Sequence, residues 1–217
     1  LDRDYQTAYA ELMPLAERGH PTSLYNIGYM YFNGAGLEQN FDEAFKFYEQ
    51  AAEKGFPMAF HQIGLYFDDG IGREVNVQEA VKWYEKAAEK GVVISHHNLG
   101  FIYETGRLTG KNDYVEAVRW YKFAADQGFA DSQVNLGILY DDGLGVIQDN
   151  KEAVRLFTLA ANQGSPNGMW RLALMYLHGE GVTQDDTKVL DLTTKAAELN
   201  FSLAQHDMGL YYNDGQL

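Results

Sequence analysis

Hydrophobic residues recur at helical spacing along the whole chain, in segments of about a dozen residues separated by short polar turns. In one kind of segment, positions i, i+3, i+4, i+7 and i+8 form a single apolar face, as in Ala80, Trp83, Tyr84, Ala87 and Ala88. A second kind is clearest over residues 132–142 and leads to Gly143. We expect both kinds to be helices that end at Gly91 and Gly143, because glycine readily adopts the left-handed backbone that closes a helix.

These two segments alternate with a period of 36 residues, interrupted by one step of 37. One series marks the middle of the first helix of each unit, which we call helix A: Gly28, Gly64, Gly100, Gly137, Ala173 and Gly209. Another closes the second helix, helix B: Gly19, Gly55, Gly91, Gly128, Gly164 and Asn200. Nearly all of the 22 glycines fall in such series, so glycine marks repeat positions here and does not indicate loop-rich, low-complexity sequence.

The glycine in the middle of helix A requires an explanation, since glycine inside a helix costs about 1 kcal/mol relative to alanine. Its return at one register predicts that neighbouring backbones approach closely there, with alanine pairs of helix B such as Ala87–Ala88 making the matching contact. The prolines at 21, 57 and 166 share one register, which predicts the first turn of helix A. Most of the 15 tyrosines are expected to be packing residues.

Both helices match a known repeat pattern. The first part of that pattern is met by Ala130, Leu136, Gly137, Tyr140, Gly143, Gly145, Val146 and Asp149. The second part is met by Ala80, Trp83, Tyr84, Lys86, Ala87, Ala88 and Gly91. The chain therefore resembles the Sel-one-like repeat family of the tetratricopeptide-like superfamily. The resemblance implies an all-α fold, a right-handed α/α solenoid (superhelix) of about six 36-residue helix-turn-helix repeats with about 12 helices.

The repeat pattern covers residues 1–217, which we therefore expect to form a single solenoid domain. Residues 1–19 are expected to be a lone helix B and residues 201–217 a lone helix A, with five full repeats between them at 20–55, 56–91, 92–128, 129–164 and 165–200. Neither end has the polar character of a capping repeat, so we expect a fragment of a longer array. The fifth repeat departs most from the pattern, with Ala173 for glycine, Leu192–Thr193 for the aromatic pair and Asn200 for the closing glycine.

Charge and composition exclude several classes of protein. A net charge of −14 argues against nucleic acid as a partner, because phosphate binding depends on Lys and Arg. No apolar run reaches the 18 or so residues of a membrane span, so no direct membrane insertion is expected. No targeting segment is recognised, and localisation stays undetermined, since the resemblance allows the bacterial periplasm or secretion, the cytoplasm and the ER lumen.

No catalytic, metal or cofactor site is expected. The chain has no cysteine and no recognisable nucleophile–base motif, and its G-x-G turns follow helices where a phosphate loop would follow a strand. His61, His97 and His206 share one register, but zinc needs at least three protein ligands and no third neighbour is evident.

What remains is a surface on helix A, which lines the concave side of tetratricopeptide-like solenoids. Its positions outside the core fall in three registers, which suit an extended peptide. The first, mainly aromatic and histidine, is Tyr25, His61, His97, Val134, Trp170 and His206; the second, mainly amide, is Asn26, Gln62, Asn98, Asn135, Arg171 and Asp207; the third, mainly apolar, is Tyr29, Leu65, Phe101, Ile138, Leu174 and Leu210. The candidate partner-binding residues are Tyr25, Asn26, Tyr29, His61, Gln62, His97, Asn98, Phe101, Asn135, Trp170, Arg171 and His206. Trp170 is the leading candidate, because the other two tryptophans occupy the helix B core position. For each residue, a packing role is an equal alternative.

Acidic pairs at the end of helix A predict an acidic rim at Asp68, Asp69, Asp141 and Asp142, unless these residues only favour the turn before glycine. We therefore expect a non-catalytic scaffold or adaptor that binds a protein or peptide, one with basic character if the rim takes part. The exposed repeat ends leave self-association open. The alternatives are a small-molecule-binding or hydrolytic enzyme of the β-lactam-binding type known in cysteine-rich relatives, and a purely architectural spacer.

Overall fold

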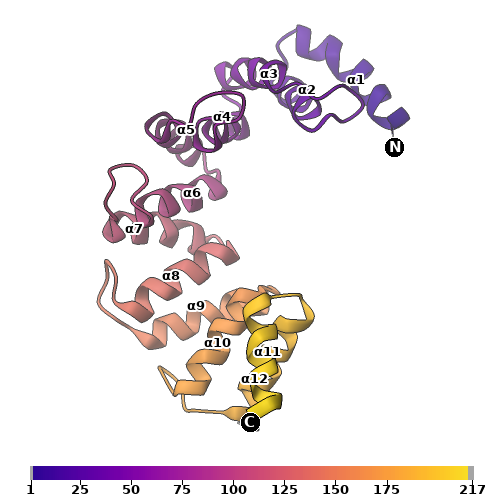
Figure 1. Cartoon of the computed structure of the whole chain (residues 1–217). Coiled ribbons are helices and arrows are strands. Elements are labelled where there is room, and N and C mark those ends of the chain that lie inside the picture. Colours follow the sequence, from indigo (N-terminus) through magenta and orange to yellow (C-terminus); the bar gives the residue numbers. More distant parts are fainter. Residues whose placement is uncertain (1, 215–217) are drawn as a thin grey trace. The chain divides into compact units, whose positions relative to one another are not determined.

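The computed structural model describes the backbone of residues 2–214 and the side chains of residues 4–211. Over that range the chain forms twelve α-helices and no strand, so the all-α fold class is confirmed (Figure 1). Gly215, at the register of the turn glycines, lies outside the described residues. The helices are α1 Asp2–Glu17, α2 Pro21–Asn33, α3 Phe41–Glu53, α4 Pro57–Asp69, α5 Val77–Glu89, α6 Val93–Glu104, α7 Tyr114–Asp126, α8 Ala130–Asp142, α9 Asn150–Asn162, α10 Pro166–His178, α11 Asp186–Glu198 and α12 Ser202–Asp214.

The helices group into two compact units, Leu1–Leu99 and Gly100–Leu217, with the boundary inside α6. In unit 1, α1 packs on α2, α2 on α3, α3 on α4 and α4 on α5; in unit 2 the same succession runs from α7 to α12, and α8 also contacts α10. Even-numbered helices are helix A of a repeat and odd-numbered helices are helix B. Each unit is therefore a stack of helix-turn-helix repeats, as the 36-residue period predicts.

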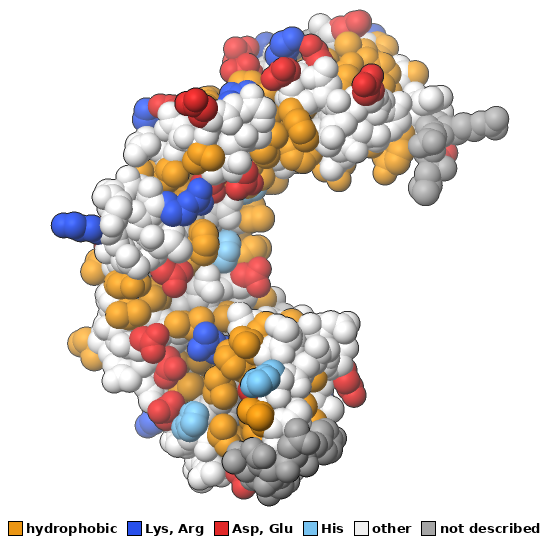
Figure 2. Space-filling view, viewed as in Figure 1, with side chains coloured by type: hydrophobic (Ala, Val, Ile, Leu, Met, Phe, Trp, Pro, Cys, Tyr) orange, Lys and Arg blue, Asp and Glu red, His pale blue; other side chains and the backbone are white. Residues whose placement is uncertain are grey.

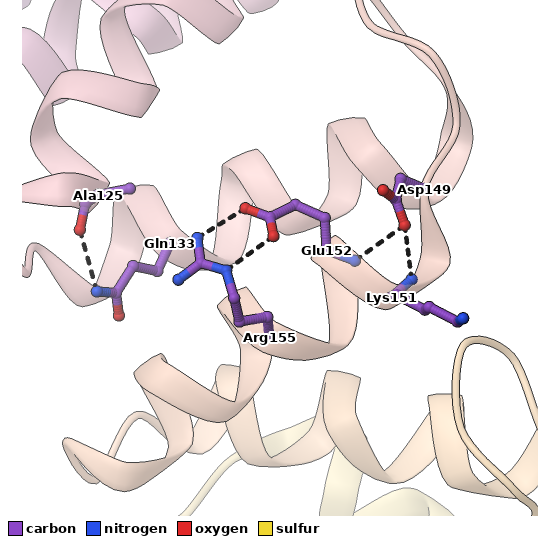
Figure 3. A network of polar contacts seen from close by, with 6 residues as sticks. All are labelled: Ala125, Gln133, Asp149, Lys151, Glu152 and Arg155. Atoms are coloured by element: carbon purple, nitrogen blue, oxygen red, sulfur yellow. Dashed lines mark hydrogen bonds and ion pairs between the residues drawn. The ribbon is translucent and has the colours of Figure 1, made fainter.

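Local capping sets where each helix begins and ends. Helix A ends at a glycine with a left-handed backbone, such as Gly143 with φ 66°, and Asn200 takes this conformation with φ 63° where the closing glycine of helix B is replaced. Helix B begins at a capping Asn or Asp. The Asp149 carboxylate accepts hydrogen bonds from the backbone N–H groups of Lys151 and Glu152 at 3.0 and 3.1 Å (Figure 3). Such a cap stabilises a helix by about 1 kcal/mol.

At Gly28, Gly64, Gly100 and Gly137 the glycine in the middle of helix A lies against an aromatic ring of helix B. The nearest group is therefore a ring, where a contact between two backbones was expected. A Cβ atom at Gly64 would lie 2.6 Å from two ring carbons of Tyr84, and one at Gly137 would lie 2.5 Å from Cε1 of Phe157. Both rings are almost fully buried, at 0% and 1% exposure. The prediction of close approach is right, but the approaching group is a ring.

The one repeat without this glycine also lacks the ring. Ala173 takes the place of glycine in α10, and the position equivalent to Tyr84 and Phe157 is Thr193 in α11. Threonine is much smaller than tyrosine, so the space that glycine provides elsewhere is not needed. Both residues are buried, at 1% exposure each. Alanine at 173 and threonine at 193, two of the three departures of the fifth repeat, are therefore one compensated change.

Among the described residues, no helix combines the length and the hydrophobicity that crossing a membrane requires.

Candidate functional site

The ends of helix A carry carboxylates that bind buried tyrosine hydroxyls. In unit 1 the Tyr84 hydroxyl donates to Oδ2 of Asp68 at 3.2 Å, and the Asn98 side chain is a further hydrogen-bond partner of this hydroxyl. Tyr84 is fully buried, and burial is the main reason that its pKa is raised. A buried hydroxyl without a partner is costly, so the acid and the amide stabilise this ring position.

Unit 2 repeats the arrangement around Tyr121. Its hydroxyl donates to Oε2 of Glu104 at 2.6 Å and accepts from Nδ2 of Asn135 at 3.0 Å. The acid comes from the helix A before the tyrosine and the amide from the helix A after it. The amides of Asn98 and Asn135 therefore already have partners within the protein, which weakens the prediction that they pair with a bound peptide.

The four carboxylates predicted to form an acidic rim differ in their exposure to solvent. Asp69 and Asp142 are exposed, whereas Asp68 is only 8% exposed and binds Tyr84, so its placement on a rim was wrong. Asp141 is half-buried. Burial is the largest cause of its raised pKa, and the nearby Glu180 and Asp142 raise it further.

Arg171 stands at the register that Asn98 and Asn135 occupy beside Tyr84 and Tyr121. In this repeat the ring is Phe157, which has no hydroxyl to bind, and Asp141 and Arg171 interact electrostatically in its place. Arg171 is half-buried, and burial lowers its pKa while Asp142 and Asp141 raise it. The guanidinium therefore compensates part of the acidic charge at the end of α8.

Trp170 joins α10 to α12. Its indole Nε1 donates to Oδ2 of Asp207 at 2.7 Å, its ring centroid lies 5.8 Å from that of Phe201, and Cζ of Arg171 lies 5.1 Å from the Trp170 centroid. The side chain is half-buried. An indole that donates to a carboxylate of the next repeat contributes to stability, which supports the packing alternative for Trp170.

Tyr25 plays the same part in unit 1. Its hydroxyl accepts from Nε2 of Gln62 at 3.4 Å, and its ring packs 5.5 Å from the Tyr48 ring and 4.9 Å from the Phe56 ring, between centroids. In both units, the first register therefore contacts the second register of the following repeat. Asn26 and Gln62 are half-buried.

His61 is not available to a partner, so that prediction was wrong. It is 3% exposed, its Nδ1 lies 2.9 Å from the Ser95 hydroxyl, and its ring centroid is 5.5 Å from that of Tyr84. Burial lowers its pKa to about 4, so the ring is neutral at pH 7. His97 is half-buried and His206 is exposed. Among the described residues, no three His, Cys, Asp or Glu side chains are grouped as metal ligands.

The third register is the most exposed of the three. Tyr29 in α2 is 49% exposed, Phe101 in α6 45% and Leu210 in α12 42%, while Ile138 and Leu174 between them are half-buried. Figure 2 shows hydrophobic side chains reaching the surface of both units among scattered carboxylates.

Sequence reasoning missed Ser95 and Glu104 as partners of buried groups. One signal was present for Glu104: an acid precedes the tyrosine by 16 or 17 residues and an amide follows it by 14. This spacing holds for Asp68, Tyr84 and Asn98 and again for Glu104, Tyr121 and Asn135. For Ser95 no comparable pattern exists.

Comparison with known proteins gives the family. The Sel1 repeat sequence model matches residues 21–56, 57–92, 93–129, 130–165, 166–201 and 202–217. A Sel1 repeat protein from Oxalobacter formigenes is 32% identical over 99% of this chain and 85% of its own, with a TM-score of 0.91. A protective antigen of uropathogenic Escherichia coli with an SLR fold is 36% identical over 94% of this chain, with a TM-score of 0.86.

This chain spans 44% of the length of the Escherichia coli antigen. An immunity protein from Pseudomonas aeruginosa, Pa5087, shares the fold with a TM-score of 0.54 at 19% identity, over 91% of this chain and 83% of its own. A search of curated protein sequences gives no match. With six repeats matched along almost the whole sequence, the chain belongs to the Sel1 repeat family, whose members generally serve as non-catalytic scaffolds for protein interaction.

Proposed function

We propose that this protein is a non-catalytic scaffold that binds an extended protein segment along helix A. The observation that carries the proposal is the helix-A row in unit 2, defined as Phe101, Ile138, Leu174 and Leu210. These four large apolar side chains stand at one register of successive helices, and the outer two are 45% and 42% exposed. Large apolar side chains held at the surface at regular spacing are typical of a protein-binding surface.

Polar and aromatic side chains accompany this row. Trp170 and Arg171 lie on α10 with their side chains half-buried, and His206 on α12 is exposed. Tryptophan and arginine are the residue types most often found to dominate binding energy at interfaces. Because both are held by contacts within the protein, they are pre-organised for a partner, which lowers the entropy lost on binding.

The charge favours a partner with basic residues. Asp69 in unit 1 and Asp142 in unit 2 are exposed carboxylates at the end of helix A, and the chain carries a net charge of −14. Opposite charge on the partner speeds association and selects against acidic competitors.

A matched pair of variants tests the proposal. Phe101 on helix A is 45% exposed and Phe123 on helix B is 44% exposed, and both belong to unit 2. Peptides are first selected against the wild-type protein from a random-sequence display library. Isothermal titration then compares the two alanine variants with the wild type.

Phe101→Ala should weaken peptide binding about tenfold or more, which corresponds to about 1.4 kcal/mol, whereas Phe123→Ala should leave it unchanged. Circular dichroism serves to show that both variants keep their helices. Equal losses in the two variants, or a loss only in Phe123→Ala, would show that helix A is not the binding face.

A further inference from the structure

Three cavities of this protein occupy the same place in the repeat, between the end of one helix B, the start of the next helix A and the following helix B. The cavity of about 420 Å³ in unit 2 includes Ala125, Asp126, Gln133 and Leu159 in its lining. The equivalent positions in unit 1 line two cavities, with Ala52, Glu53, Phe60 and Lys86 in one and Ala16, Glu17, Leu24 and Gln50 in the other. The repeat therefore presents one geometry with three different sets of side chains.

The cavity between α3, α4 and α5 is the one with aromatic walls. It has a volume of about 260 Å³ and is lined by Glu49, Ala52, Glu53, Phe60, Trp83 and Lys86. The Phe60 and Trp83 rings are stacked, with centroids 6.1 Å apart and an interplanar angle of 25°. The two half-buried rings thus form a platform that leaves part of its surface open to the cavity.

Two observations give this cavity a preference for cations. Glu49 and Glu53 are exposed on α3 and supply two carboxylates at its edge. Independently, Lys86 already places its ammonium Nζ 4.1 Å from the centroid of the Trp83 ring. The negative face of an indole attracts a cation more strongly than any other side-chain ring, and the protein itself occupies that face with one.

The other two cavities lack this combination. The unit 2 cavity has no aromatic lining residue, and its Arg155 is paired with Glu152 at 2.6 Å (Figure 3). The other unit 1 cavity is lined by Arg18 and Lys54 as well as by two glutamates, and by no aromatic residue. The two provide controls of the same geometry within the chain.

We infer that the cavity between α3, α4 and α5 is a binding site for an arginine side chain of a partner protein. A guanidinium stacks flat on the Trp83 face, where Lys86 now lies, and donates hydrogen bonds to Glu49 and Glu53. Arginine suits the site better than lysine, because its planar group stacks on aromatic rings and binds carboxylates with paired N–H donors. The site is independent of the helix-A row and of the binding proposed there.

The test uses the full chain, labelled with ¹⁵N, and two blocked peptides, acetyl-Gly-Arg-Gly-amide and the same peptide with citrulline in place of arginine. Citrulline has nearly the same shape as arginine but no charge. The arginine peptide should shift the Trp83 indole resonance saturably and leave those of Trp120 and Trp170 in place, while the citrulline peptide should shift none of them.

Two sets of variants sharpen the result. The double variant Glu49→Gln/Glu53→Gln should weaken binding about fivefold or more. Lys86→Gln should tighten it about twofold or more, because it removes the internal cation from the ring, whereas Lys90→Gln removes the same charge at an exposed position outside the cavity and should have a smaller effect. These fold-changes are those expected of cation–π and exposed ion-pair contacts.

Equal binding of the arginine and citrulline peptides would overturn the inference. The same holds for the absence of a saturable Trp83 shift up to the solubility limit of the arginine peptide, and for weaker binding by Lys86→Gln. None of these results bears on the helix-A row, whose test uses Phe101 and Phe123.

Discussion

Substituting the glycine in the middle of helix A by alanine tests how the repeats pack. Gly64 in α4 is the clearest site, because a Cβ atom there would lie 2.6 Å from both Cδ1 and Cε1 of Tyr84. The Tyr84 ring is fully buried and its hydroxyl is bound to Asp68 at 3.2 Å, so the ring cannot turn aside without losing that hydrogen bond. We expect Gly64→Ala to lower the free energy of unfolding.

Two contributions of opposite sign set the size of the change in the free energy of unfolding. Alanine is favoured over glycine inside a helix by about 1 kcal/mol. Overpacking a buried site costs about 1–3 kcal/mol. A contact at 2.6 Å is far inside the normal separation of carbon atoms, about 3.5–4.0 Å, so we take the upper part of that range. The net expectation is a loss of about 1–2 kcal/mol in the free energy of unfolding.

The repeats supply matched controls. In the repeat of Ala173 the ring position holds Thr193, so Ala173→Gly relieves no crowding by a ring; it should lose about 1 kcal/mol by helix propensity and up to about 1 kcal/mol more by removing a buried methyl group. At Gly209 no described atom outside its local backbone lies within 4 Å of the added Cβ, so Gly209→Ala should be neutral or slightly stabilising. Urea unfolding followed by circular dichroism measures all three variants. If Gly64→Ala proves as stable as the wild type, the ring does not require the glycine and the account of this register is wrong.

Three further predictions concern polar side chains with hydrogen-bond partners inside the protein. The folded-state pKa of His61, about 4, is below its ordinary value of 6.5, so its contribution to stability is complete above pH 6.5 and is lost as the pH falls toward 4. The advantage of the wild type over His61→Gln should shrink by roughly 2–3 kcal/mol between pH 7 and pH 4.5 in urea titrations, and a constant difference would contradict the burial argument. Tyr121→Phe leaves Glu104 without its hydroxyl donor and should lower the free energy of unfolding by about 1–2 kcal/mol; an unchanged urea midpoint would show that this hydroxyl contributes nothing. Trp170→Phe removes the donor to Asp207 and should lower the melting temperature, a shift that a purely surface role for the indole would not produce.

The repeat architecture could be predicted from the sequence because its signals are local. Glycine at 91 and 143 ends a helix through its own backbone freedom, and both have positive φ, 81° and 66°. The proline at 57 lies in the first turn of α4, where its missing N–H costs nothing. Each of these signals depends on residues within one turn of helix, and their return every 36 residues gave the stacking order.

The surface was predicted less well, because exposure depends on what a neighbouring helix supplies. His61 shares its register with the exposed His206, yet His61 is buried because it contacts the Ser95 hydroxyl and the Tyr84 ring. By contrast, Tyr29 and Phe101 are 49% and 45% exposed, as a partner-binding role requires.

The adjacent residues Asp68 and Asp69 show most directly how the position of a helix end can be predicted while the exposure of its side chains cannot. The residue pattern alone placed both at the end of a helix, before Gly70, whose left-handed backbone closes that helix. Their different surroundings come from packing between helices: Asp68 is 8% exposed and binds a tyrosine hydroxyl of α5, while Asp69 faces solvent. Neighbouring positions on a helix point about 100° apart, so packing one of them against the next helix leaves the other in water. Helix ends follow from the chain's own backbone, whereas the role of each side chain follows from the helix packed against it.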